Sequence, residues 1–195
     1  YIVNRRRADR PDGTRLTVFK LGEEGEEYIS TFGSHGEGPG QFIWPMAIAL
    51  DKNNVYVTDE WTNRITIFNK DGEYQSHWGT PGSGDGELDR PAGITIGPDG
   101  AVYVVDSRNN RVQKFSLDGK FLGKFGTAGS ANGEFNLPWG ICLDKDGNIF
   151  VADWRNDRIQ SFTNDGKWLA TFGRPGTGGD CSIARDKGGV TYVDI

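Results

Sequence analysis

The sequence predicts an all-β fold, a β-propeller built from four-stranded antiparallel blades. Pairs of Phe or Trp with Gly end at Gly33, Gly79, Gly126 and Gly173, so the pattern returns after 46, 47 and 47 residues. Between these pairs, short apolar runs alternate with turns, and 29 glycines and eight prolines provide the turn residues. A fixed period of this length, filled with short strands, is typical of propeller blades.

Residues 91–126 show the four strands of one blade in order. Short apolar runs at 94–96, 101–106, 111–115 and 121–125 predict the strands, and Asp-Gly turns close two of the hairpins. Period-two alternation bounded by such turns is typical of antiparallel hairpins. The same order predicts complete blades at 45–79, 91–126 and 138–173, which Gly-rich connectors join.

Both ends of the chain match only part of a blade. Residues 1–33 lack an innermost strand, and residues 181–195 resemble the first two strands of a blade. We therefore expect one continuous array over residues 1–195, with about four blades present. Because both ends offer the same second strand, we expect the array to be a piece of a longer ring.

Composition limits the classes of partner. The net charge of −5 argues against nucleic acid, because phosphate binding favours a basic face. The basic run Arg5–Arg7 is expected to be a solvated loop, and Cys142 and Cys181 do not form a disulfide framework. No apolar run reaches the ~18–20 residues needed to cross a bilayer. The compartment stays open, with a secreted or periplasmic location favoured over a cytoplasmic one.

Six charged residues recur at equal positions in the three complete blades. They lie on either side of the loop between the second and third strands, as Asp59 and Arg64, Asp106 and Arg111, and Asp153 and Arg158. A carboxylate there can accept loop N–H groups and pair with the guanidinium. A residue copied into every blade is expected to maintain the fold, so we interpret these six as structural, with Asn109 and Asn156 bracing the same loops.

Binding residues are expected where the copies differ. In a propeller, the loops between strands two and three share one face with the segments that lead into each inner strand. There the sequence places Trp44, Glu60, Trp61, Arg90, Arg108, Trp139, Trp154 and Arg155. Trp and Arg are enriched at binding hot spots, so this rim is predicted to bind a protein, a peptide or a glycan. The alternative is that some of the tryptophans fill the boundaries between blades.

No catalytic residue, metal site or cofactor is predicted. His35 and His77 are the two histidines, and by themselves they cannot supply a three-histidine zinc site. No nucleophile–base pair is recognisable from spacing.

The repeat resembles the NHL-repeat family of β-propellers. The resemblance lies in Pro138–Asp144, in Gly147–Asp153, in the Asn156–Phe162 stretch and in the closing Phe172–Gly173, and three copies in register carry it. It implies a six-bladed ring. The rim composition, together with the lack of a recognisable nucleophile–base pair, favours a non-catalytic binding scaffold. Two alternatives stay open. One is an enzyme, similar to peptide-amidating lyases or gluconolactonases, whose metal site lies partly in blades outside this sequence. The other is RNA binding.

Overall fold

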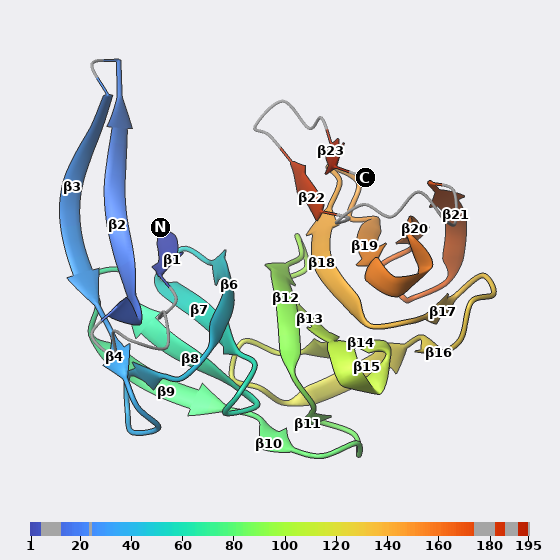
Figure 1. Ribbon diagram of the computed structural model, residues 1–195, viewed down its shortest axis with the longest axis horizontal. Helices are drawn as coiled ribbons and strands as arrows, with labels where there is room; N and C mark the ends of the chain where they lie inside the picture. The colour runs from blue at the N-terminus through green and yellow to red at the C-terminus, as the bar shows by residue number, and fades with distance from the viewer. Residues whose placement is uncertain (5–12, 24, 174–181, 186–190, 195) are drawn as a thin grey trace.

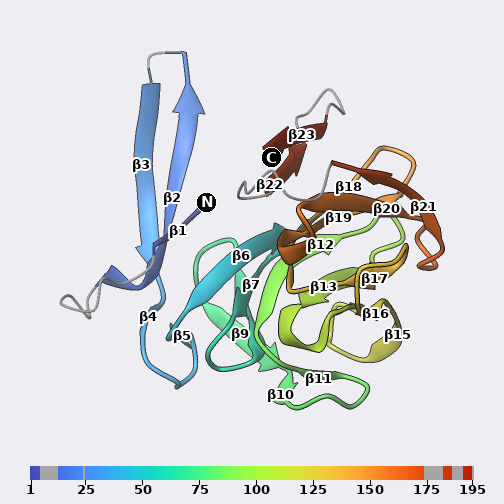
Figure 2. The same cartoon turned by 45° about the vertical axis from the view of Figure 1, so that its right-hand side comes forward.

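The computed structural model describes residues 1–4, 13–23, 25–173, 182–185 and 191–194. These residues form almost entirely β-strands, arranged as sheets that stand side by side along an arc (Figures 1 and 2). The basic run Arg5–Arg7 and Cys181 lie outside the described residues. No helix in the described part is long and apolar enough to cross a membrane.

Three sheets have four antiparallel strands each, in the order of the chain, which confirms the predicted fold class. We call them blades 1, 2 and 3. Blade 1 consists of β6 (Pro45–Leu50), β7 (Asn54–Asp59), β8 (Arg64–Asn69) and β9 (Tyr74–Trp78). Blade 2 consists of β12 (Pro91–Ile96), β13 (Val102–Asp106), β14 (Arg111–Phe115) and β15 (Phe121–Phe125). Blade 3 consists of β18 (Pro138–Leu143), β19 (Ile149–Asp153), β20 (Arg158–Phe162) and β21 (Trp168–Phe172).

Each end of the chain adds a smaller sheet. Strands β1 (Ile2–Asn4), β2 (Arg15–Gly22) and β3 (Gly25–Phe32) form one, and β22 (Ser182–Arg185) pairs with β23 (Thr191–Asp194) in the other. The β2–β3 hairpin is longer than the outer hairpins of the blades and projects away from them (Figure 1).

The hydrophobic core lies between neighbouring blades. Ile65 and Ile67 of blade 1 pack with Ile94, Val102 and Val104 of blade 2. A second cluster joins blade 2 to blade 3 in the same way. Burying one Val or Ile side chain contributes about 1.5–3 kcal/mol, and a single sheet cannot bury both faces alone. Alternation along each strand therefore produces blades that are stable only when stacked.

The aromatic residue that closes a blade packs against the next blade. The ring of Trp78 lies 4.7 Å from that of Phe115, and the ring of Phe125 lies 4.8 Å from that of Phe162. A Cβ at Gly119 would lie 2.3 Å from Trp78, so the turn of blade 2 needs glycine for this close approach. Phe172, the equivalent residue of blade 3, is 47% exposed.

The Gly-rich connectors contain short parallel strand pairs that the sequence did not predict. They are β4 (Ser34–His35) with β5 (Gln41–Phe42), β10 (Thr80–Pro81) with β11 (Glu87–Leu88), and β16 (Thr127–Ala128) with β17 (Glu134–Phe135). Phe42, Leu88 and Phe135 end these pairs as fully buried side chains. Each connector is thereby fastened to its blade.

Candidate functional site

The loops between the second and third strands lie beside the segments that lead into the inner strands. The backbone N–H of Glu60 donates to the carbonyl of Trp44 at 3.0 Å. In blades 2 and 3 the bond is shifted by one residue on each side, and the N–H groups of Arg108 and Arg155 donate to the carbonyls of Asp89 at 3.1 Å and Asn136 at 3.0 Å. The topology and these bonds place both kinds of segment on one face of the array, which we call the rim.

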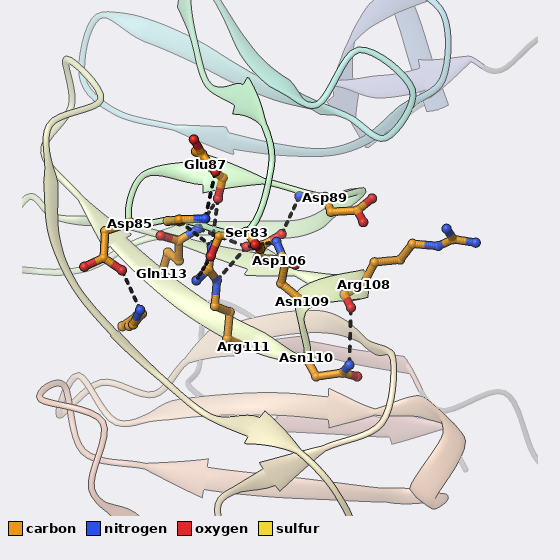
Figure 3. A network of polar contacts seen from close by, with 12 residues as sticks. Ser83, Asp85, Glu87, Asp89, Asp106, Arg108, Asn109, Asn110, Arg111 and Gln113 are labelled. Carbon is orange, nitrogen blue, oxygen red and sulfur yellow. Dashed lines mark hydrogen bonds and ion pairs between the residues drawn. The ribbon is translucent and has the colours of Figure 1, made fainter.

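A buried polar network lies beneath the rim in blade 2 (Figure 3). Oδ2 of Asp106 accepts from Arg111 Nε at 2.7 Å, from Asn109 at 2.9 Å and from Gln113 at 3.0 Å. Oδ1 accepts the backbone N–H of Asp89 at 2.7 Å. Burial raises the pKa of the Asp106 carboxyl above its ordinary value, and the hydrogen bonds from Asp89, Asn109 and Arg111 only partly oppose this rise. Blade 3 repeats the arrangement around Asp153 with Asn156, Arg158 and Gln160.

The guanidinium groups of the repeated arginines fasten the connectors. Arg111 donates to the carbonyls of Ser83, Gly84 and Glu87 at 2.7–2.9 Å. Arg158 donates to the carbonyls of Ala131 and Glu134. Because these groups are buried and bonded to backbone, they do not face a ligand.

Blade 1 departs from the predicted ion pair. Asp59 accepts four backbone N–H groups, those of Ile43, Trp44, Trp61 and Thr62. Arg64 bonds only connector carbonyls, so the expected pair of Asp59 with Arg64 is absent. Blade 1 has Thr62 and Thr66 where blade 2 has Asn109 and Gln113, and these shorter side chains do not reach the carboxylate. Asp59 instead bonds the backbone of its own loop and of the segment that leads into β6.

The rim tryptophans lie at the surface. Trp61 is 62% exposed, Trp44 47% and Trp139 38%, and Trp154 is partly covered. The alternative in which Trp44, Trp61 or Trp139 fills a blade boundary therefore does not describe their positions. The cores between the described blades consist of other side chains.

Two groups of rim residues touch. Trp139 and Trp154 lie with ring centroids 5.8 Å apart, and the guanidinium of Arg155 lies 4.6 Å above the Trp154 ring. Separately, Arg90 forms an ion pair with Glu60 at 3.1 Å. The Arg108 side chain extends away from the buried network (Figure 3), and its guanidinium has no partner among the described residues.

A cavity of about 450 Å³ opens on the rim between blades 2 and 3. Its lining comes from the loop of blade 2, the connector and the loop of blade 3: Asn110, Ala128, Gly129, Ser130, Phe135, Asn136 and Asn156. Ser130 and Asn136 were not predicted as site residues. The position two residues before the repeated proline holds Ile43, Asp89 and Asn136 in the three blades. Comparing this apolar, acidic and amide side chain could have indicated Asn136 from the sequence.

Within the part of the chain that the structure describes, no three His, Cys, Asp or Glu side chains are grouped so as to hold a metal ion. His77 instead hydrogen bonds through Nδ1 to the hydroxyl of Tyr74 at 2.7 Å. Burial and the nearby Arg64 charge lower the pKa of His77.

Stacked four-stranded blades with loops gathered on one rim define the class of this protein as a β-propeller. A family described as a 6-bladed beta-propeller matches residues 52–130, and the NHL repeat matches residues 135–162. Both matches are to propeller repeats, so the chain is a β-propeller that resembles the NHL-repeat proteins over residues 135–162.

Similar proteins share the fold. RING finger protein nhl-1 of Caenorhabditis elegans is 37% identical over 66 residues, 33% of this chain and 7% of that protein. Virginiamycin B lyase from Staphylococcus aureus superposes with a TM-score of 0.60 at 22% identity, over 77% of this chain and 48% of the lyase. The gluconolactonase XC5397 from Xanthomonas campestris gives a TM-score of 0.61 at 17% identity, over 92% of this chain and 65% of that enzyme. The chain spans about half the length of the lyase.

Proposed function

We propose that this propeller is a binding scaffold whose rim captures a protein or peptide segment. The observation that carries the proposal is the exposure of three tryptophans on one face, led by Trp61 at 62%. Large aromatic side chains usually bury most of their surface, and Trp is enriched among residues that dominate binding energy. These tryptophans therefore offer apolar contact area that a partner would cover.

The backbone beneath the rim is fixed in advance. Oδ1 of Asp59 accepts the N–H groups of Trp61 and Thr62, each at 3.0 Å. The backbone N–H of Trp44 donates to the same carboxylate at 3.2 Å. A binding surface held rigid in its free state loses less conformational entropy when the partner arrives.

The test is selection of binding peptides from a random display library on the immobilised chain. The affinity of the peptides selected on the wild-type chain is then measured for the wild type, for the double variant Trp61→Ala/Trp139→Ala and for Leu122→Ala. Leu122 is the matched control, because it is 51% exposed but lies on the outer strand β15. We expect the double variant to weaken binding by about tenfold or more and the control to leave it unchanged.

Thermal unfolding of the same variants separates binding from folding. Because Trp61 and Trp139 are exposed, we expect all three proteins to unfold at similar temperatures. Selected peptides that bind the double variant as tightly as the wild type would overturn the proposal.

A propeller enzyme is the second candidate, because relatives of the same fold include a virginiamycin B lyase and a gluconolactonase. The likeness concerns the fold, and one fold hosts many chemistries. Assays for both activities on this chain decide between the candidates, and turnover that Trp61→Ala/Trp139→Ala leaves intact would favour the enzyme.

A further inference from the structure

The cavity between blades 2 and 3 has walls fixed by hydrogen bonds across the blade boundary. Asn110 Oδ1 of blade 2 accepts the backbone N–H of Leu137, which leads into blade 3, at 2.8 Å. Asn156 Nδ2 donates to the carbonyl of Gly129 and to Asp153, both at 2.9 Å. The orientation of both side chains is thus set before any ligand binds.

The groups left over in this cavity can each donate a hydrogen bond as well as accept one. The side-chain amide of Asn136 and the hydroxyl of Ser130 are exposed and bond no other described residue. Arg108 and Arg155, in the loops that contribute Asn110 and Asn156, are exposed cations. None of the lining residues carries a carboxylate. Such a surface favours a ligand rich in acceptors, and negative charge in particular.

Two acidic side chains of the segments around the cavity, Asp153 and Glu134, are already bonded. Asp153 is fully buried and accepts the N–H of Asn136 at 2.7 Å and the guanidinium of Arg158 at 2.7 Å. Glu134 accepts the backbone N–H of Ala131 at 2.9 Å. Asp157 lies in the same loop as Arg155 and corresponds in position to Asn110.

The boundary between blades 1 and 2 has the same pair of hydrogen bonds but a carboxylate where the other boundary has an amide. Asn63 Oδ1 accepts the backbone N–H of Arg90 at 2.7 Å, and Asn109 Nδ2 donates to the carbonyl of Gly82 at 2.8 Å. There, however, Asp89 stands at the position of Asn136, and Glu60 pairs with Arg90. The same hydrogen bonds thus build both boundaries, and the charged residues Asp89, Glu60 and Arg90 distinguish the first from the second.

We propose that the cavity between blades 2 and 3 seats a carboxylate side chain of an acidic peptide segment. The Asn136 amide and the Ser130 hydroxyl donate to the carboxylate, and Arg108 and Arg155 provide the positive field. This inference rests on the proposed function, because it names the chemistry of the partner that the rim captures. It predicts that Asp89 repels the same group at the neighbouring boundary.

Nuclear magnetic resonance of the ¹⁵N-labelled chain tests the proposal. The probe is an acetylated, amidated peptide of alternating Glu and Gly, and the matched peptide has Gln in place of Glu. We expect the Glu peptide to shift the side-chain amide signal of Asn136 and the Nε–H signal of Arg155 saturably, and the Gln peptide to leave both unmoved. Equal shifts by both peptides, or no shift by the Glu peptide, would overturn the proposal.

Two variants with the same change of charge sharpen the test. Asn136→Asp copies the residue of the other boundary, and Asn164→Asp places the charge in the exposed turn between β20 and β21. We expect Asn136→Asp to weaken the Glu peptide about tenfold, because like charges in contact repel, and Asn164→Asp to weaken it less than twofold. Equal affinity of the two variants would contradict the assignment.

The two proposals fail in different ways. If display selection yields peptides that depend on the rim tryptophans but not on acidic residues or Asn136, the carboxylate site is wrong and the scaffold stands. If no selected peptide depends on the tryptophans, the scaffold proposal itself is wrong.

Discussion

Replacing the buried aspartate by asparagine should reduce the free energy of unfolding more in blade 2 than in blade 1. In Asp106→Asn the amide loses the negative charge that balances Arg111, whose Nε lies 2.7 Å from the carboxylate. In Asp59→Asn the lost partners are backbone N–H groups, and no guanidinium loses its counter-charge. Both aspartates are fully buried, so solvent does not screen the difference.

The magnitudes follow from what each variant leaves unpaired. Breaking a buried ion pair on one side costs about 3–5 kcal/mol, whereas leaving a buried donor without its acceptor costs about 1–3 kcal/mol. We therefore expect Asp106→Asn to reduce the free energy of unfolding by about 2 kcal/mol more than Asp59→Asn. Guanidinium chloride unfolding, followed by tryptophan fluorescence, measures both values.

A double-variant cycle tests the assigned cause. Arg111→Met removes the guanidinium, so Asp106→Asn should cost less in that background than in the wild type. Equal costs for the two aspartates, or no coupling between Asp106 and Arg111, would refute the reasoning.

Two further outcomes are expected. Gly93→Ala should destabilise the chain by about 1–3 kcal/mol, because its Cβ would lie 2.7 Å from the carbonyl oxygen of Trp139, whereas Gly123→Ala, with nothing within 4 Å, should not; equal unfolding midpoints would contradict this. Burial and the hydrogen bond to Asp51 raise the pKa of Tyr56 to about 12. The unfolded chain loses that proton near pH 10, so stability should fall between about pH 10 and 12, and less so in Tyr56→Phe. Unfolding titrations across that range measure the difference.

The strands were predictable because local patterns determine them. Alternating apolar residues, Asp-Gly turns and the repeat period are all sequence-local, and the strands of blades 1–3 follow them. The parallel pairs in the connectors were missed, because they form between residues that show no alternation and depend on burial of Leu88 and its equivalents.

The candidate site was predictable only in part. The repeat identified which loops share the rim, so Trp61 and Arg108 could be placed there from the sequence. The cavity could not, since it depends on how closely two blades stack and on whether Asn110 reaches the N–H of Leu137. The missing ion pair of Asp59 could not be predicted either, because the Arg64 guanidinium donates to three connector carbonyls instead, a choice that the repeat does not show.

The hydrogen bonds that join one blade to the next each connect an Asn of the earlier blade to the segment that leads into the later blade. Asn63 accepts the backbone N–H of Arg90, 27 residues later in the chain. Asn110 accepts the backbone N–H of Leu137, which also lies 27 residues later. During synthesis the acceptor of each boundary is therefore made first, on a blade that is already complete, and the segment that must dock on it emerges afterwards. A chain made from its N-terminus can therefore dock each new blade on a finished one.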